Sequence, residues 1–467
     1  MYPLMNFFSI LLIIWYLYIF TKKDFKEKYI LCFVTFCLLG ILNLRGYFIF
    51  LGSSTEIRYD IFAGCALSLF SIFNYSKIKK YITHRYSLYI NAAIVIPIIA
   101  ITYSILFPYG EPVISNTDDY VKGIYSIRAN SVYFGSFILG YMCYLSFIFS
   151  CVYIKVLLQI ADIEKITKII NKILFFNTIY IAFEFVLKNI VVTSITFDVL
   201  AVILGTGKDT NVEFTSRNGL YVLEGLTREP SHVAITLFLT FIFFVIEKQY
   251  YRKWKLRTID FCYCFLILLL LYLSGSFTAV FFMAILIVFI FYFYKKNGFF
   301  ESNKIIGKIF FCVLLFLVIV TGTTISDNDY VLKRVDGLLT SFDYVNSVFI
   351  FGIVNFGEFD VSAFSRMFNI YDSFLHFCNR PILGLTINYI GALGGVVSVL
   401  CDLGIIGTFF WMKNIFYGKS YNKFVFLLVV IIPNLLFGYN GLIHYVYIPF
   451  LLAAFDIKYM EEKKELK

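Results

Sequence analysis

Thirteen apolar runs, most of them long enough to form a membrane-spanning helix, divide this chain of 467 residues. A helix needs about 20 mostly apolar residues to cross the hydrocarbon core of a bilayer. Most connections between the runs are short and polar, so the pattern predicts an all-α polytopic membrane protein with about 13 spans (12–14) and a single integral membrane domain over 1–467. The runs cover residues 4–20, 29–44, 59–75, 88–107, 129–154, 170–188, 230–246, 258–273, 277–294, 309–325, 387–412, 424–438 and 442–455.

Composition excludes the other broad classes of protein. The chain is 60% hydrophobic and 15% charged, whereas soluble globular proteins are about 45–50% apolar and about 25% charged. Disordered chains are polar and poor in aromatic residues, but this chain is 20% aromatic. The net charge of +10 comes from short basic clusters between the apolar runs, so we interpret it as a signal of membrane orientation and expect no nucleic acid partner.

The distribution of Lys and Arg predicts that orientation. Of the 40 basic residues, 28 lie in one alternating set of connections and 12 in the other, which contains the longer loops. Because cytoplasmic connections carry the excess of Lys and Arg, we expect the N-terminus outside and the C-terminus in the cytoplasm. Nine of the ten cysteines lie in apolar runs, Cys378 being the exception, and no Cys/His spacing is typical of a zinc site. The sequence therefore predicts no metal and no cofactor.

Two loops on the predicted external side carry the ionisable residues of interest, and they cover residues 205–228 and 326–386. The first contains Arg217 and leads into Arg228, Glu229 and His232, where a helix is expected to begin at Pro230. In the second, apolar residues recur with a helical period over 364–378, which predicts a short amphipathic helix that lies on the membrane surface. The alternative interpretation of the first pattern is an interfacial belt of snorkelling charges, and that of the second is a plain interfacial helix.

Arginine at this level has a specific chemical use. Lipid-linked sugar donors carry a diphosphate at the depth of the headgroups, and the planar guanidinium fork matches phosphate oxygens. Arg217, Arg228 and Arg366 are therefore candidate ligands of a diphosphate.

A few polar residues and glycines lie inside the apolar runs. Glu184 and Lys188 are spaced as i and i+4 and are expected to pair. Asp402 lies well inside its run and must face protein or a watery cavity, or be protonated, so it serves either packing or function. Gly404 and Gly407 are interpreted as a small-residue face for close helix contact.

The order of four short motifs resembles that of bacterial O-antigen and capsular repeat-unit polymerases of the Wzy type, which are related to the O-antigen ligases. The motifs are Leu226-Thr227-Arg228-Glu229-Pro230-Ser231-His232, Leu273-Ser274-Gly275-Ser276, Ser365-Arg366 followed by Asn379-Arg380-Pro381-Ile382-Leu383-Gly384-Leu385, and Asp402-Leu403-Gly404-Ile405-Ile406-Gly407. Two departures stand out: relatives often have arginine where this chain has Phe277, and the histidine typical of ligases is Ile387 here, ahead of Asn388. The second departure favours a polymerase over a ligase.

The resemblance implies a GT-C-like glycosyltransferase in the bacterial cytoplasmic membrane. Its substrates would be oligosaccharides linked to undecaprenyl diphosphate, with membrane lipid around it and a chain-length regulator protein as a possible partner. Arg228 and Arg366 would bind the diphosphate, with Arg217 in reserve. Glu229 and His232 are the leading candidates for the general base, followed by Asp372 and His376. The alternatives are an O-antigen ligase and a polysaccharide flippase or exporter.

Overall fold

A computed structural model gives the fold over most of the N-terminal three-fifths of the chain and over one later segment. It describes residues 7–22, 24–41, 47–50, 56–109, 113–114, 127–128, 134–160, 163–192, 216–217, 220–226, 230–251, 258–274, 276, 279–280, 282–286, 370, 373–387 and 395–415. The predicted runs 309–325, 424–438 and 442–455 lie outside these residues, as does most of the predicted loop 326–386.

The described part of the chain is mostly helical, and its helices lie where the apolar runs are. The helices are α1 (Phe7–Thr21), α2 (Phe25–Ile41), α3 (Tyr59–Phe73), α4 (Tyr75–Ile78), η1 (Lys79–Tyr81), α5 (His84–Leu106), α7 (Phe134–Ile160), α8 (Ile163–Val186), the π-helical turn η2 (Leu187–Val191), α10 (Pro230–Tyr251), α11 (Thr258–Leu273) and α16 (Gly395–Ile415). Residues 373–379 form a further short helix.

Four helical segments are both long and apolar enough to cross a membrane, within the residues that the structure describes. They are His84–Leu106, Gly140–Leu157, Lys168–Val191 and Val396–Asn414. Shorter apolar helices cover Phe7–Thr21, Phe62–Phe73, Pro230–Phe244 and Ile259–Leu273. The chain is therefore compatible with a helical membrane protein, as its composition predicts.

The helices pack side by side in a continuous series. Helix α10 contacts α8 and α11, α2 contacts α8 and α3, α3 contacts α7, and α16 contacts both α5 and α7. Large aromatic side chains fill the interior; the stacked rings of Tyr29 and Tyr153 lie 3.9 Å apart between centroids. Large apolar side chains also cover the outside, for example Leu88 and Ile98 on α5 and Phe176 on α8. A large apolar outer surface is typical of helices that face lipid.

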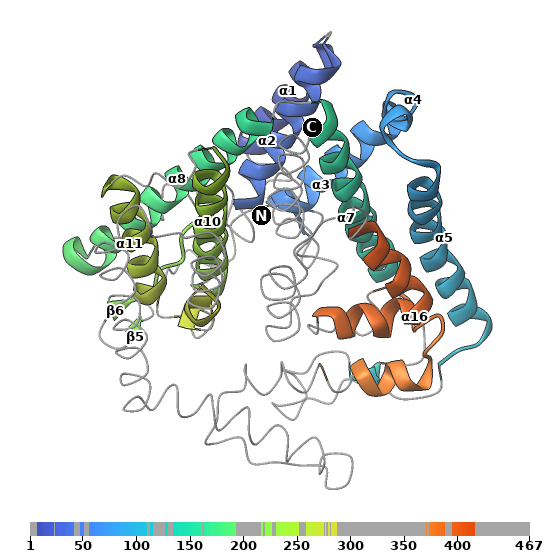
Figure 1. Ribbon diagram of the computed structural model, residues 1–467. Helices are drawn as coiled ribbons and strands as arrows, with labels where there is room; N and C mark the ends of the chain where they lie inside the picture. Colours follow the sequence, from blue (N-terminus) through green and yellow to red (C-terminus); the bar gives the residue numbers. More distant parts are fainter. Residues whose placement is uncertain are drawn as a thin grey trace, which may run out of the picture.

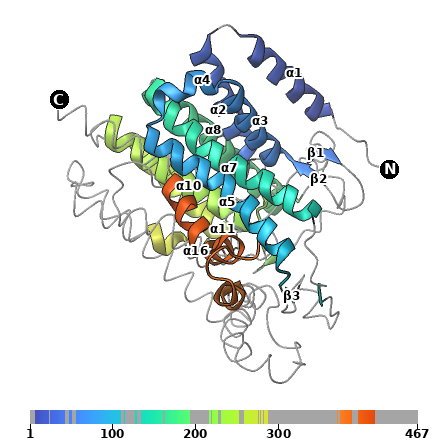
Figure 2. The ribbon, with the colours of Figure 1, turned by 90° about the vertical axis from the view of Figure 1, so that its right-hand side faces the viewer.

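Three short antiparallel strand pairs lie between helices, a feature that the all-α prediction does not include. They are β1 (Tyr47–Phe50) with β2 (Glu56–Arg58), β3 (Val113–Ile114) with β4 (Ile127–Arg128), and β5 (Ser216–Arg217) with β6 (Leu220–Tyr221). In Figure 1, β5–β6 and the orange segment 373–387 lie toward the lower end of the helices, and Figure 2 shows the same structure after a 90° turn about the vertical axis. The lower ends of α5 and α16 lie there as well.

Candidate functional site

Helix α16 is broken in its middle, at Gly404. This residue has φ 64° and ψ −172°, far from helical values, and Figure 1 shows the two halves of α16 running in different directions. In a continuous helix, the N–H groups of Ile405 and Ile406 would donate to the carbonyls of Cys401 and Asp402. The break separates both pairs, so four backbone groups need other partners.

The segment 381–386 supplies those four partners. The N–H groups of Ile405 and Ile406 donate to the carbonyls of Pro381 and Ile382, at 2.8 and 3.3 Å. In return, the carbonyls of Cys401 and Asp402 accept from the N–H groups of Leu385 and Thr386, at 2.8 and 2.9 Å. Irregular backbone at membrane depth is tolerated where it is buried in protein and its polar groups are satisfied. The segment Pro381–Thr386 and the broken turn of α16 at residues 401–406 therefore pair through their backbones. We call this pairing the α16 joint.

Two glycines make this close approach possible. A Cβ atom on Gly404 would lie 2.3 Å from the carbonyl oxygen of Ile382, and one on Gly384 would lie 2.6 Å from the carbonyl carbon of Asp402. Both glycines also have positive φ, at 64° and 70°, which other L-residues adopt at a cost. Thr386 adopts a φ of 106° next to the joint, and its hydrogen bond to the Asp402 carbonyl holds it there.

A polar cluster lies between the residues that follow α5 and the short helix 373–379, which precedes the α16 joint in the sequence. The hydroxyl of Tyr109 is 2.6 Å from Nδ1 of His376, and Nδ2 of Asn379 donates to the same hydroxyl at 3.1 Å. His376 and Tyr109 are 6% and 5% exposed. His376 and Asn379 are three residues apart in a helix, so they lie on the same face and reach one hydroxyl together.

Arg380 attaches this short helix to the C-terminal end of α5. Its guanidinium lies 5.2 Å from the ring centroids of both Tyr103 and Tyr109. It donates to the hydroxyl of Ser104 at 3.5 Å and to the carbonyl of Phe107, the residue that caps α5. The last carbonyls of a helix lack partners within the helix, and a cation there is favourable. Ser104 in turn donates to the carbonyl of Leu385 at 2.8 Å, inside the joint.

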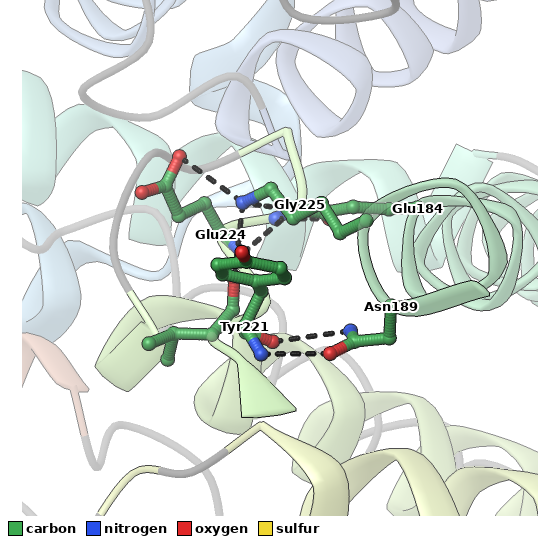
Figure 3. A network of polar contacts seen from close by, with 7 residues as sticks. Glu184, Asn189, Tyr221, Glu224 and Gly225 are labelled. Atoms are coloured by element: carbon green, nitrogen blue, oxygen red, sulfur yellow. Dashed lines mark hydrogen bonds and ion pairs between the residues drawn. The ribbon is translucent and has the colours of Figure 1, made fainter. Parts of the chain in front are cut away.

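Residues 221–226, which follow the predicted loop residue Arg217 and precede Arg228, form the other candidate part of the site. Buried charges fix this segment against the end of α8 (Figure 3). The Glu184 carboxylate accepts from the N–H groups of Glu224 and Gly225, at 2.9 and 2.7 Å. Lys188 lies 3.1 Å from Glu184 and 3.7 Å from the Glu224 carboxylate, and it donates to the carbonyl of Val222 at 3.0 Å. The predicted pairing of Glu184 with Lys188 is confirmed, and Glu224 joins them.

Asn189 also holds this segment, through two hydrogen bonds to the backbone of Tyr221. Its Oδ1 accepts from the N–H of Tyr221 at 2.7 Å, and its Nδ2 donates to the Tyr221 carbonyl at 3.2 Å. Lys188 and Asn189 lie in η2, where the π-helical turn changes the positions of side chains relative to a regular helix. Three side chains from one end of α8 and η2 thus hold residues 221–225, directly before the Thr227-Arg228-Glu229 sequence that leads into α10.

The structure describes only some of the predicted site residues. His232 lies in the first turn of α10 and is 6% exposed, and His376 lies in the cluster with Tyr109. Arg217 belongs to β5, where its backbone pairs with Leu220. Arg228, Glu229, Arg366 and Asp372 lie outside the described residues.

Tyr109, Asn379, Arg380 and Glu224 contribute to these clusters but received no role from the sequence. Asn379 and Arg380 begin the motif that continues through Pro381 to Leu385, and this position in the motif was the sequence feature that could have indicated a role for them. Nothing in the sequence around Tyr109 or Glu224 sets either residue apart from other loop residues. Asp402 is 5% exposed, and its carbonyl forms part of the joint.

Within the described ranges, no group of three or more His, Cys, Asp and Glu side chains is arranged to hold a metal ion. Comparisons of the chain with protein-family models, with curated proteins and with solved structures found no match.

Proposed function

We propose that this chain is a polytopic glycosyltransferase of the bacterial cytoplasmic membrane that polymerises repeat units linked to undecaprenyl diphosphate. In this proposal the chain has about 13 spans in a GT-C-like arrangement. The N-terminus lies outside, the C-terminus lies in the cytoplasm, and the lower end in Figure 1 is the external face.

The observation that carries the proposal is that two motif-bearing segments lie toward the same end of the helices. Residues 220–226 and 373–387 come from distant parts of the sequence, and Figure 1 shows both toward the lower end, on opposite sides of the view. Each is attached to a helix end by polar contacts, the first through the buried pair Glu184 and Lys188 and the second through Arg380 and the α16 joint. Segments held in this way can bring groups from separate loops to one substrate.

The proposed reaction is a displacement at the anomeric carbon of the donor glycan. A hydroxyl oxygen of the acceptor repeat unit forms a bond to that carbon while the bond from the carbon to the phosphate oxygen breaks. The electron pair leaves with undecaprenyl diphosphate, and the hydroxyl proton passes to a base. Arg228 and Arg366 would bind the diphosphate and stabilise the charge that develops on it, and Arg217 would support them.

Holding donor and acceptor side by side supplies much of the expected rate. Two lipid-linked glycans in one membrane meet rarely in the correct orientation, and a positioned pair reacts as one molecule. Glu229 and His232 are the leading candidates for the base, followed by Asp372 and His376. A chain-length regulator would act on how many transfers follow one another.

An exporter is the second candidate, because discontinuous helices such as α16 also occur at transporter sites. In transporters the exposed backbone groups bind the cargo. Here the groups released at Gly404 bind residues 381–386 of the same chain, an arrangement suited to a fixed joint. We therefore rank polymerisation above export. Ile387, which stands in place of the histidine typical of ligases, ranks it above ligation to a lipid core.

Deletion of the gene followed by analysis of surface and membrane-bound glycan tests the three functions together. Loss of a polymerase leaves single repeat units that still reach the surface. Loss of a ligase leaves long glycan on the polyprenyl carrier, and loss of an exporter leaves lipid-linked units on the cytoplasmic side. Purified protein that extends a lipid-linked repeat unit in detergent or vesicles would support polymerisation directly.

A further inference from the structure

We infer that the connection between α3 and α5 forms a binding surface for the headgroups of anionic phospholipids. This basic surface consists of four cations in the connection and at the start of α5, with one at the end of α7: Lys77, Lys79, Lys80, Arg85 and Lys155. The connection contains α4, which lies toward the upper end of the molecule in Figures 1 and 2, away from residues 373–387. In the proposed orientation this end faces the cytoplasm, but the inference does not depend on the proposed glycosyl transfer.

The basic surface carries a net positive charge that its own segment does not neutralise. The sequence contains no Asp or Glu between Asp60 and Glu111, a stretch that includes four of the five cations. The ion pairs that the structure describes involve none of these four, and all four side chains are exposed. A cluster of four or more Lys and Arg residues beside an apolar span is typical of a surface that attracts anionic lipid.

The backbone of the connection is held in place by contacts with the helices around it. Ile78 is 1% exposed and anchors the middle of the connection in the protein. Nε2 of Gln159, at the end of α7, donates to the carbonyl of Tyr81 at 3.3 Å. Lys79 and Lys80 lie between these two attachment points, in η1. Their two exposed ammonium groups are therefore presented from a fixed turn.

The other three cations lie over aromatic rings. The pairs are Lys77 with Phe25, Lys155 with Tyr86 and Arg85 with Tyr89, at 5.3, 4.9 and 5.9 Å from the ring centroids. A cation over a ring keeps its charge. Tyr75 and Tyr81 of the connection are 45% and 37% exposed, and tyrosine is enriched where a membrane meets water. Rings and cations together indicate that this surface lies at the depth of lipid headgroups.

Apolar side chains beside the cations favour a phospholipid over a soluble anion. Phe73, at the end of α3, is 76% exposed, and Leu88, in the first turns of α5, is 54% exposed. A phospholipid satisfies both kinds of group, because its phosphate contacts the ammonium groups while its acyl chains cover the apolar side chains. A soluble anion would leave the apolar side chains uncovered.

Titration of the purified full-length protein in a neutral detergent with short-chain lipids tests the inference. The readout is the melting temperature as a function of lipid concentration, with dioctanoyl phosphatidylglycerol as the anionic probe and dioctanoyl phosphatidylcholine as the zwitterionic one. We expect the anionic lipid to raise the melting temperature at a lower concentration than the zwitterionic lipid does. Each lysine near an anionic lipid surface strengthens binding about fivefold, so Lys79→Gln/Lys80→Gln should need about 20-fold more phosphatidylglycerol. Lys79→Arg/Lys80→Arg keeps both charges and should respond as the wild type does.

The matched control is Lys165→Gln/Lys172→Gln, which removes two exposed lysines from α8, where Glu164 precedes Lys165. This control should respond to phosphatidylglycerol as the wild type does. Equal loss in both Gln variants would show that net charge alone sets the affinity and would overturn the inference, as would equal responses of the wild type to the two lipids. Equal stabilisation by inorganic phosphate would indicate a site for free anions and would also overturn it. The titration contains no glycan, so failure of the proposed polymerase activity would leave its result standing.

Discussion

The carboxylate of Glu184 lies 3.1 Å from Nζ of Lys188, and the two side chains are 0% and 2% exposed. Removing two charges from water is costly, and a hydrophobic pair of similar volume is often at least as stable. The pair is nevertheless well connected, since Glu184 binds two backbone N–H groups and Lys188 binds the carbonyl of Val222. Its main consequence is the fixed position of residues 221–225, just before Arg228.

We predict that Lys188→Met lowers the melting temperature of the purified protein strongly, because it leaves Glu184 buried without its cation. Loss of one partner of a buried ion pair costs about 3–5 kcal/mol. The double variant Glu184→Gln/Lys188→Met removes both charges and should recover part of the loss. A double-mutant cycle on the melting temperatures measures this coupling. Simple additivity of the two substitutions would show that the pair does not act as a unit.

The joint at α16 makes a separate prediction about glycine. Gly404→Ala would place a Cβ atom 2.3 Å from the Ile382 carbonyl oxygen in a residue with φ 64°. A residue with a Cβ adopts this sparsely populated backbone conformation (φ 64°, ψ −172°) at a cost of about 1–3 kcal/mol. The clash must also separate the two segments of the joint. We expect little folded protein by size-exclusion chromatography. Ile405→Ala is the control, because that side chain is 55% exposed and only its backbone enters the joint. Normal folding of Gly404→Ala would contradict the joint.

The same glycine shows how far the sequence allowed prediction. Gly404 and Gly407 were both interpreted as a face for close helix contact. Gly407 fits that interpretation, since a Cβ there would lie 3.2 Å from Ile96 of α5. For Gly404 the interpretation was wrong, because the residue breaks the helix. Glycine permits both close approach and positive φ. Only the pairing of α16 with residues 381–386, which the local sequence around Gly404 does not reveal, shows which of the two roles Gly404 has.

Elements set by local pattern were predictable, and contacts between distant segments were not. Apolar runs of the right length marked the positions of α5 and α11, and Pro230 marked the start of α10. The i, i+4 spacing of Glu184 and Lys188 predicted their pairing, but Glu224 lies 40 residues from Glu184 and joins through tertiary packing. Tyr109 and His376 are 267 residues apart, and no periodicity in the sequence relates them.

Arg380 is expected to stabilise the end of α5 through its planar fork. Arg380→Ala should lower the melting temperature, and Arg380→Lys should recover little, because an ammonium cannot bind Ser104 and Phe107 while it stacks on two rings. Thermal unfolding in detergent measures both. Arg85→Lys is a matched control, since Arg85 also lies over a tyrosine ring and binds its hydroxyl, but on the exposed surface. Similar small shifts at both positions would contradict a structural role for Arg380.

Orientation can be tested at Cys378, which is exposed on the short helix 373–379. In a Cys262→Ser background, a maleimide that does not cross membranes should label Cys378 on intact spheroplasts, where the outer face of the cytoplasmic membrane is accessible. A Lys80→Cys substitution in η1, combined with Cys378→Ser, should be labelled only after the membrane is opened. Labelling in the reverse order would place residues 373–387 on the cytoplasmic side and would remove the proposed external site.

The proposed diphosphate ligands make the most direct prediction about function. Arg228→Ala and Arg366→Ala should each leave single repeat units in place of long glycan, because each removes a cation that stabilises the leaving diphosphate. Loss of such a group lowers the rate about 10²–10³-fold, which is enough to stop repeated transfer. The measurement is the glycan ladder on a gel, normalised to protein level. Arg128→Ala, in the β3–β4 pair, is the control and should give the wild-type ladder. Wild-type chain lengths in both test variants would show that the two arginines do not hold the diphosphate.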